Sequence, residues 1–155
     1  MTKLHTDPRL DQIISSLHRV ASRALIVRDG KLLITKEVSE HPELELRGIP
    51  GGGVDRGEDF REALVRELNE ELGIVVDEKQ ISQHPVKIDF CDMIVPDTNY
   101  AIPTVQAYYI VSLADHQSPT AVDNDFVWMD ADEIKSAKFV LHAKSAVGLL
   151  LDQLK

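Results

Sequence analysis

A chain of 155 residues, 43% of them apolar, is long enough for one ordinary globular domain. Its formal charge of −9 disfavours generic nucleic-acid binding, because a phosphate backbone is bound through Lys and Arg. No apolar run approaches the roughly 20 residues needed to span a bilayer, and Met1–His5 do not resemble a secretory signal. The one cysteine, Cys91, rules out an internal disulfide; we expect it to be half-buried and the protein to be cytoplasmic.

The N-terminal segment reads as a helical extension, residues 1–18, of a single domain that spans 1–155. Asp7 can cap a helix with Pro8 at its first position. Apolar residues then recur at helical spacing up to about His18.

Two aliphatic runs follow, Val20–Val27 and Lys31–Thr35. The dipeptide Asp29-Gly30 between them is a strong signal for a hairpin turn, because both turn residues must accept positive φ. The polar stretch Glu37–Glu45 is expected to be a loop. The run Ile49–Gly53, with three successive glycines, is expected to interrupt regular structure.

The next helix has clear signals at both ends. Asp59 and Glu62 form a capping box, and Gly73 supplies the C-terminal cap. Between them an apolar stripe repeats every four residues, formed by Phe60, Leu64, Leu68 and Leu72.

Three more strands and a helix complete the chain. Strands are expected at Val86–Ile94, Thr104–Leu113 and Phe126–Met129, with a loop at Pro96–Pro103 and a final helix at Leu141–Leu154. Strands that lie before, between and after helices predict an α/β (α+β) domain with helical layers around a mixed sheet.

Three carboxylates share one face of the capped helix. Glu67, Glu70 and Glu71 lie at i, i+3 and i+4, beside the leucine stripe and therefore at the edge of the core. Such like charges repel one another unless cations are present. Oxygen ligands at this density suit Mg²⁺ or Mn²⁺, and the adjacent glycines leave room for a phosphate. A solvated acidic helix face is the alternative.

The segment Gly52–Ile74 resembles the Nudix box, Gly-x5-Glu-x7-Arg-Glu-aliphatic-x-Glu-Glu-x-Gly-aliphatic. It matches every defined position, through Gly52, Glu58, Arg66, Glu67, Leu68, Glu70, Glu71, Gly73 and Ile74. The resemblance extends loosely from about Val20 to Ile134. It implies an α/β/α sandwich around a mixed sheet and a MutT-like hydrolase.

The resemblance also implies roles for individual residues. Glu67, Glu70 and Glu71 would bind Mg²⁺ or Mn²⁺ together with the Gly52 carbonyl, and Arg66 would pair with Glu58. The reaction would be metal-dependent hydrolysis of a phosphoanhydride in a nucleoside diphosphate linked to another moiety, by attack of water on phosphorus. The general base stays open among the glutamates and a later carboxylate. A homodimer is a further partner that the resemblance allows.

Substrate contacts are expected from residues outside the box glutamates. Arg23 lies mid-strand among apolar residues, where an unpaired guanidinium is costly, so either a substrate phosphate or a protein partner is expected there. Gly51 and Gly53 can offer backbone groups to a phosphate. Asp125 or Asp123 can supply a late carboxylate, or cap a turn instead. Tyr100, Tyr108, Tyr109 and Trp128 can stack a base, although core packing is favoured for Trp128.

Other functions remain open at this point. A non-catalytic nucleotide sensor would keep the fold without needing three metal-binding carboxylates. An RNA 5′-end pyrophosphohydrolase would need a basic surface that the composition does not favour. Isopentenyl-diphosphate isomerases share the fold, but Cys91 does not lie in a matching context. The substrate is otherwise expected to be a small phosphorylated metabolite or nucleotide.

Overall fold

The computed structural model describes residues 9, 18–36, 46–94, 101–139 and 141–150. The expected N-terminal helix and the expected loop Glu37–Glu45 therefore lie outside the described residues, apart from single positions. The elements, in chain order, are β1 (Arg19–Leu25), β2 (Val27–Arg28), β3 (Lys31–Lys36), β4 (Arg47–Gly48), β5 (Gly51–Gly53), α2 (Phe60–Leu72), η2 (Glu78–Gln80), β6 (Lys87–Ile94), β7 (Ala101–Ile110), β8 (Phe126–Met129), α3 (Ala131–Ser136) and α4 (Leu141–Leu150).

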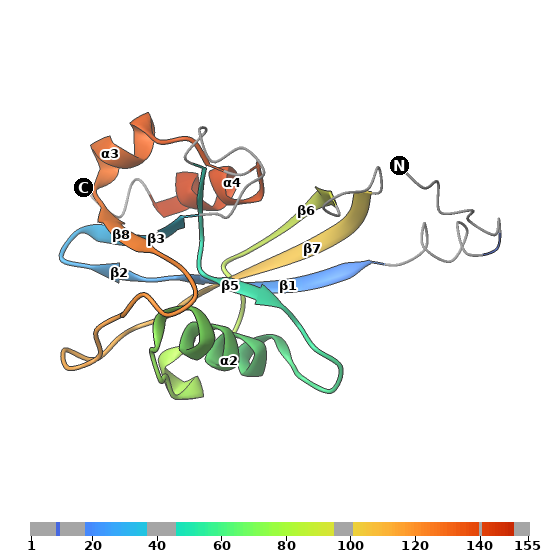
Figure 1. The fold of residues 1–155 in the computed structure, drawn as a ribbon, viewed down its shortest axis with the longest axis horizontal. Helices are drawn as coiled ribbons and strands as arrows, with labels where there is room; N and C mark the ends of the chain where they lie inside the picture. Colours follow the sequence, from blue (N-terminus) through green and yellow to red (C-terminus); the bar gives the residue numbers. More distant parts are fainter. Residues whose placement is uncertain (1–8, 10–17, 37–45, 95–100, 140, 151–155) are drawn as a thin grey trace.

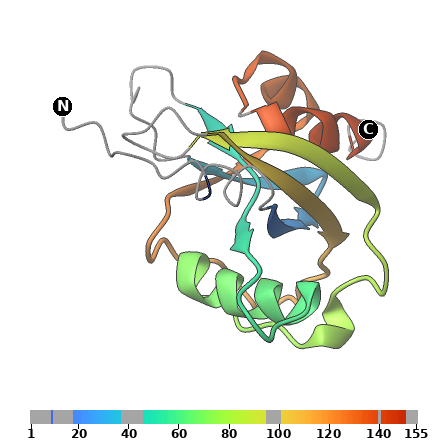
Figure 2. The same cartoon turned by 90° about the vertical axis from the view of Figure 1, so that its right-hand side faces the viewer.

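The strands form two sheets. The first has four strands in the order β5-β1-β7-β6 and is mixed, because β1 runs parallel to β7 and antiparallel to β5. The second joins β2, β3 and β4, with β8 paired to β3. Helix α2 lies on one side of the strands, and α3 and α4 lie on the other (Figures 1 and 2). This is the expected α/β/α arrangement around a mixed sheet.

Each side of the strands has its own apolar core. On one side, Leu64, Leu68 and Leu72 of α2 pack with Ala24, Leu33 and other buried residues. On the other side, α3 and α4 pack on residues that include Leu25, Ile49 and Tyr108. Adjacent strand residues such as Ala24 and Leu25 face opposite cores because side chains alternate along a strand. None of the described helices is long and apolar enough to cross a membrane.

Local turn and cap signals are confirmed. Asp29 and Gly30 both have positive φ, 51° and 72°, as the hairpin turn requires. The capping box of Asp59 and Glu62 is formed, and Gly73 ends α2 in the left-handed conformation. The strand Phe126–Met129 is found with the expected bounds.

Several expected boundaries are wrong. The run Ile49–Gly53 interrupts regular structure only at Ile49 and Pro50, because Gly51–Gly53 pairs with β1 as a short antiparallel strand. The first strand ends at Leu25 rather than Val27. Strand β7 begins at Ala101 and ends at Ile110; Pro103 is accommodated inside it, opposite Asp92.

The final helix begins at Leu141, as expected, and is described as far as Leu150. Helix α3 was not predicted, although Asp130 and Glu133 form a capping box at its start. The expected loop Pro96–Pro103 lies partly outside the described residues.

The leucine stripe of α2 makes a stability prediction. Leu68 is fully buried, so Leu68→Ala leaves a cavity and should lower the free energy of unfolding by about 2–5 kcal/mol. Leu149→Ala is the matched control, since Leu149 is 49% exposed and should change stability by at most about 0.5 kcal/mol. Urea unfolding followed by circular dichroism measures both. Equal losses in the two variants would contradict this assignment of the core.

Candidate functional site

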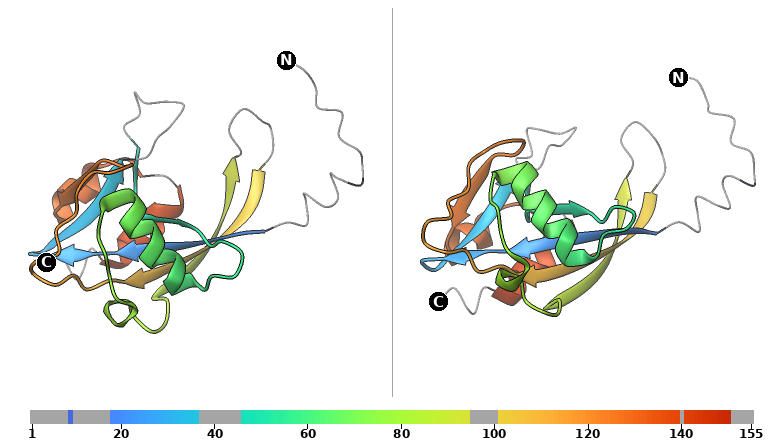
Figure 3. Two further views of the ribbon diagram at one scale, coloured as in Figure 1. Left: turned by 60° about the horizontal axis from the view of Figure 1, so that its bottom comes forward. Right: turned by 90° about the horizontal axis from the view of Figure 1, so that it is seen from below.

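Helix α2 carries the three box glutamates on the flank beside its buried leucines. It lies across the sheet next to β1 and β5, as the views from below show (Figure 3). The Glu67 side chain is 15% exposed and the Glu70 side chain 52% exposed. Glu71 accepts a hydrogen bond at 3.0 Å from the backbone N–H of Gly51. The helix therefore directs two of its carboxylates, those of Glu67 and Glu71, at β5, the glycine strand (Gly51–Gly53).

With Glu67 in this position, only glycine fits at position 52, because the Glu67 carboxylate fills the space that a side chain would need. A Cβ placed on Gly52 would lie 2.4–2.6 Å from the three atoms of the Glu67 carboxylate group. Ser22 is the cross-strand partner of Gly52, and its buried hydroxyl has no hydrogen-bond partner among the described residues. Gly52 thus lies against the Glu67 carboxylate and is paired with a residue whose buried hydroxyl is unsatisfied.

Arg66 connects the helix to the loop that precedes it. Its Nε and NH2 donate to the two carboxylate oxygens of Glu58 at 2.6 and 2.9 Å, a bidentate pairing. Its NH2 also donates to the Gly53 carbonyl at 2.9 Å. Its NH1 reaches Glu67 at 2.8 Å and Glu70 at 3.3 Å. The Arg66 guanidinium therefore offsets the repulsion among the carboxylates of Glu58, Glu67 and Glu70. It also holds the glycine strand through the Gly53 carbonyl.

Glu58 is held in its ionised form. The Arg66 guanidinium, aided by the backbone N–H of Asp55, lowers the pKa of the Glu58 carboxyl from 4.5 to about 2. The same contacts raise the pKa of Arg66 above its ordinary value. The Glu58–Arg66 pairing implied by the resemblance is thus present, and Asp55 is a supporting residue that the sequence did not indicate.

The donor set fits a hard divalent cation. The candidate ligands Glu67, Glu70 and Glu71 offer only oxygen, and Gly52 allows one carboxylate to lie directly against the backbone. No group of three or more His, Cys, Asp or Glu side chains is already gathered around a single point in the described ranges. Arg66 instead contacts Glu67 and Glu70. An ion that binds all three glutamates therefore requires the Glu70 side chain to leave Arg66 and turn toward the ion.

Arg23 contacts protein groups on the face of the sheet away from α2. Its Nε donates to Gln106 Oε1 at 3.0 Å, and its NH1 donates to the carbonyls of Ile49, at 3.1 Å, and Gly51. The partner expected for this mid-strand guanidinium is therefore neutral rather than acidic. Gln106 is only 3% exposed, and its position as a lone amide in a predicted strand is the sequence signal for this partner.

The late carboxylates lie near the end of α2. The backbone N–H groups of Val122 and Asp123 donate to the Glu71 carbonyl at 3.2 and 3.3 Å. Asp125 is exposed, and its carbonyl accepts from the N–H of Lys36. The loop that contains Asp123 and Asp125 is thus brought to the helix turn that carries Glu71.

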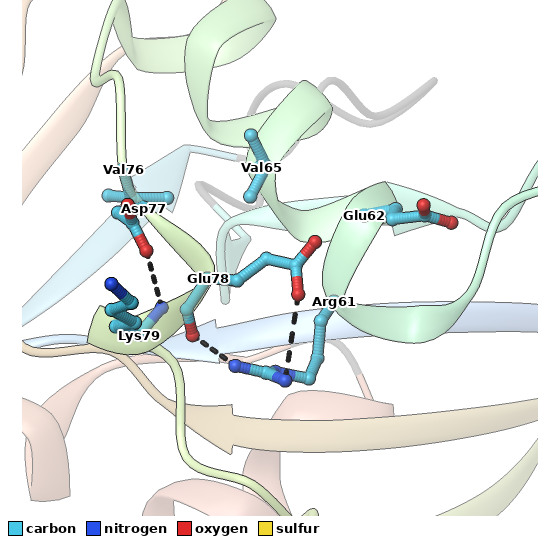
Figure 4. A pocket seen from close by; sticks show the side chains of 7 residues that line it. All are labelled: Arg61, Glu62, Val65, Val76, Asp77, Glu78 and Lys79. Atoms are coloured by element: carbon cyan, nitrogen blue, oxygen red, sulfur yellow. Dashed lines mark hydrogen bonds and ion pairs between the residues drawn. The ribbon is translucent and has the colours of Figure 1, made fainter.

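The aromatic candidates are mainly structural. Tyr108 is fully buried and Tyr109 is 5% exposed, whereas Tyr100 lies outside the described residues. Trp128 packs against the core on the α2 side, which confirms the expected core role. The Arg28 guanidinium carbon lies 5.7 Å from its ring centroid. A shallow pocket of about 600 Å³ between α2 and η2 is lined by Arg61, Glu62, Val65, Val76, Asp77, Glu78 and Lys79 (Figure 4). It lies on the opposite flank of α2 from the glutamates.

The Glu58–Arg66 pair makes a pH prediction. A lowered pKa stabilises the folded state fully above pH 4.5, and this contribution is lost as the pH falls toward about 2. Glu58→Gln should therefore lower the urea midpoint at pH 7, and the gap to the wild type should narrow below pH 4.5. Asp132→Asn, at a 94% exposed carboxylate, is the control and should show little gap at any pH. A gap for Glu58→Gln that is constant with pH would contradict the prediction.

Known proteins resemble this chain in sequence and in fold. The NUDIX domain model matches residues 17–148. A 51-residue stretch, 33% of this chain and 38% of the relative's length, is 47% identical to CTP pyrophosphohydrolase of Escherichia coli K12. The crystal structure of a MutT NUDIX hydrolase from Burkholderia pseudomallei superposes with a TM-score of 0.63 at 26% identity, covering 90% of this chain and all of that one.

A second solved structure extends the likeness. The solution structure of the E. coli ORF135 protein superposes with a TM-score of 0.66 at 25% identity, over 86% of this chain and 90% of that chain. The family match covers most of the sequence and includes β1, the glycine strand and α2. The chain therefore belongs to the Nudix family of MutT-like hydrolases.

Proposed function

We propose that this chain hydrolyses a phosphoanhydride bond in a nucleoside diphosphate linked to another moiety, with Mg²⁺ or Mn²⁺ as cofactor. The observation that supports it most is the packing of Glu67 on Gly52, with Glu71 tied to Gly51 on the same short strand. Carboxylates set against glycine backbone leave space for a phosphate and for a cation between them.

The chain's own residues would divide the work as follows. Glu67, Glu70, Glu71 and the Gly52 carbonyl would hold the cation. Arg66 keeps the helix and the glycine strand in register through Glu58 and Gly53. Gly51 and Gly53 would present backbone groups to the phosphates. When bound, the cation would neutralise the charge on the pyrophosphate and polarise the phosphorus under attack.

A carboxylate must also take the proton of the attacking water. Glu67, Glu70 and Glu71 lie within about one turn of α2, so any of the three would be able to take this proton. The Asp123–Asp125 loop, which is joined to Glu71 through backbone hydrogen bonds, would be the alternative source. Arg23 would assist indirectly by holding the Gly51 carbonyl, and a direct contact from Arg23 to a substrate phosphate stays a prediction.

The relative named CTP pyrophosphohydrolase supports the choice of bond and of test substrates. CTP is itself a nucleoside diphosphate linked to a further phosphate. Cytidine and other nucleoside triphosphates therefore belong in the first assay, beside nucleotide sugars and dinucleotides. A 5′-triphosphorylated RNA tests the alternative substrate that the charge of −9 disfavours.

The decisive assay measures phosphate and pyrophosphate release from this panel with Mg²⁺, Mn²⁺ or EDTA. We expect metal-dependent turnover that Glu70→Gln lowers by about a hundredfold or more, since even outer-shell changes at metal sites cost 10–100-fold. Glu62→Gln is the matched control, because Gln still completes the capping box and lies away from the glutamate face. Nucleotide binding without turnover would favour the non-catalytic sensor instead.

Gly52→Ala tests the contact with Glu67. The added methyl group would overlap the Glu67 carboxylate, which is the flexible end of a side chain and can move aside. We expect the fold to survive and turnover to fall at least about tenfold, since a shift of about 1 Å in a catalytic group already costs rate. Thermal unfolding and the same release assay separate the two effects. Full activity with a displaced Glu67 would remove this residue from the proposed site.

A further inference from the structure

Strand β6 presents an apolar stripe to solvent. It is the last strand in the order β5-β1-β7-β6, so one of its edges has no strand partner in the described part of the chain. Along it and just before it, Val86, Ile88 and Phe90 are 48%, 53% and 78% exposed. Within the strand, Ile88 and Phe90 alternate with half-buried neighbours, so these two lie on one face. Val86 precedes the strand, and its backbone N–H donates to the Tyr108 carbonyl at 2.7 Å. Apolar side chains on a free strand edge favour pairing with another chain.

The stripe lies on the same side of the sheet as α2 but is not covered by it. Ile88 is paired with Ala107 of β7, and Ala107 belongs to the core beneath α2. Helix α2 itself packs against β5 and β1, at the opposite end of the sheet. Figures 1 and 2 show β6 extending away from α2.

We propose that β6 pairs antiparallel with β6 of a second copy of this chain, about a twofold axis at Ile88. In that register Ile88 faces its own copy, Val86 faces Phe90, and Lys87 faces Asp89. Each of these contacts is favourable across antiparallel strands: aliphatic with aliphatic, aromatic with β-branched, and cation with anion. The interface is isologous, because both copies use the same surface.

The charges select this register over its neighbours. An axis at Asp89 would place two aspartates opposite each other, and an axis at Lys87 would oppose two lysines. An axis at Phe90 would put Ile88 against Asp92. Within one chain Lys87 Nζ lies 3.8 Å from Asp89 Oδ2, so both charges are already on one face of the strand. A twofold axis at Ile88 turns that pair into two pairs between chains.

Charge reversal tests the register without touching the core. Sedimentation equilibrium should find the wild type dimeric, and both Lys87→Asp and Asp89→Lys should raise the dimer Kd by about tenfold or more. Mixing the two variants should restore association as a heterodimer, because all four charges then face opposite charges. Lys31→Glu, at an exposed residue outside β6, is the control and should leave the Kd unchanged.

A covalent test uses the axis itself. With Cys91→Ser as background, Ile88→Cys should give a disulfide-linked dimer on oxidation, since directly opposed residues lie about 4.5–5.5 Å apart at Cα. Val86→Cys should not, because its own copy would be about 13 Å away along the strands. A monomeric wild type, a dimer indifferent to the charge reversals, or equal cross-linking at both positions would overturn the proposal.

Discussion

The arrangement of the site depends on how one guanidinium is shared. Glu67, Glu70 and Glu71 crowd one flank of α2, an arrangement that weakens an isolated helix. Arg66 contacts two of these carboxylates, and it is itself fixed by the bidentate pair with Glu58. The Gly53 carbonyl completes its contacts. Acidic residues can therefore concentrate at the edge of the core without forcing the helix away from the sheet.

A second arginine holds the glycine strand from the other face. A strand of three glycines has no side chains to pack, so its position depends on backbone contacts. Arg66 binds the Gly53 carbonyl from the α2 side, and Arg23 binds the carbonyls of Gly51 and Ile49 from the opposite side. Gly51, with φ of 123°, also lies so close to Ser22 that no Cβ would fit. The glycines thus leave the backbone of β5 accessible to a ligand but make the strand less rigid. The contacts of Arg23 and Arg66 fix its position again.

Features encoded by neighbouring residues could be predicted, and features that depend on distant partners could not. The capping box, the Asp29-Gly30 turn and the Glu58–Arg66 pair each lie within a short stretch of chain. Strand β5 was missed because its pairing with β1 joins segments about 30 residues apart. The partners of Arg23 escaped for the same reason, since Gln106 lies on β7. The metal-ligand and substrate roles stay predictions, because no side-chain geometry alone identifies a bound cation or nucleotide.

The dimensions of the sheet connect the site to the exposed stripe on β6. Strands lie about 4.8 Å apart and a helix is about 10 Å wide, so one helix covers about two strands. Glu71 contacts Gly51, so α2 is placed over β5 and β1, and its first residue, Phe60, reaches Tyr109 of β7. In this position α2 leaves the exposed residues of β6 uncovered. The apolar residues of β6 are then exposed in a single copy as a consequence of where the site is built. A second copy that extends the sheet would cover them without moving α2, so assembly and access to the site need not compete.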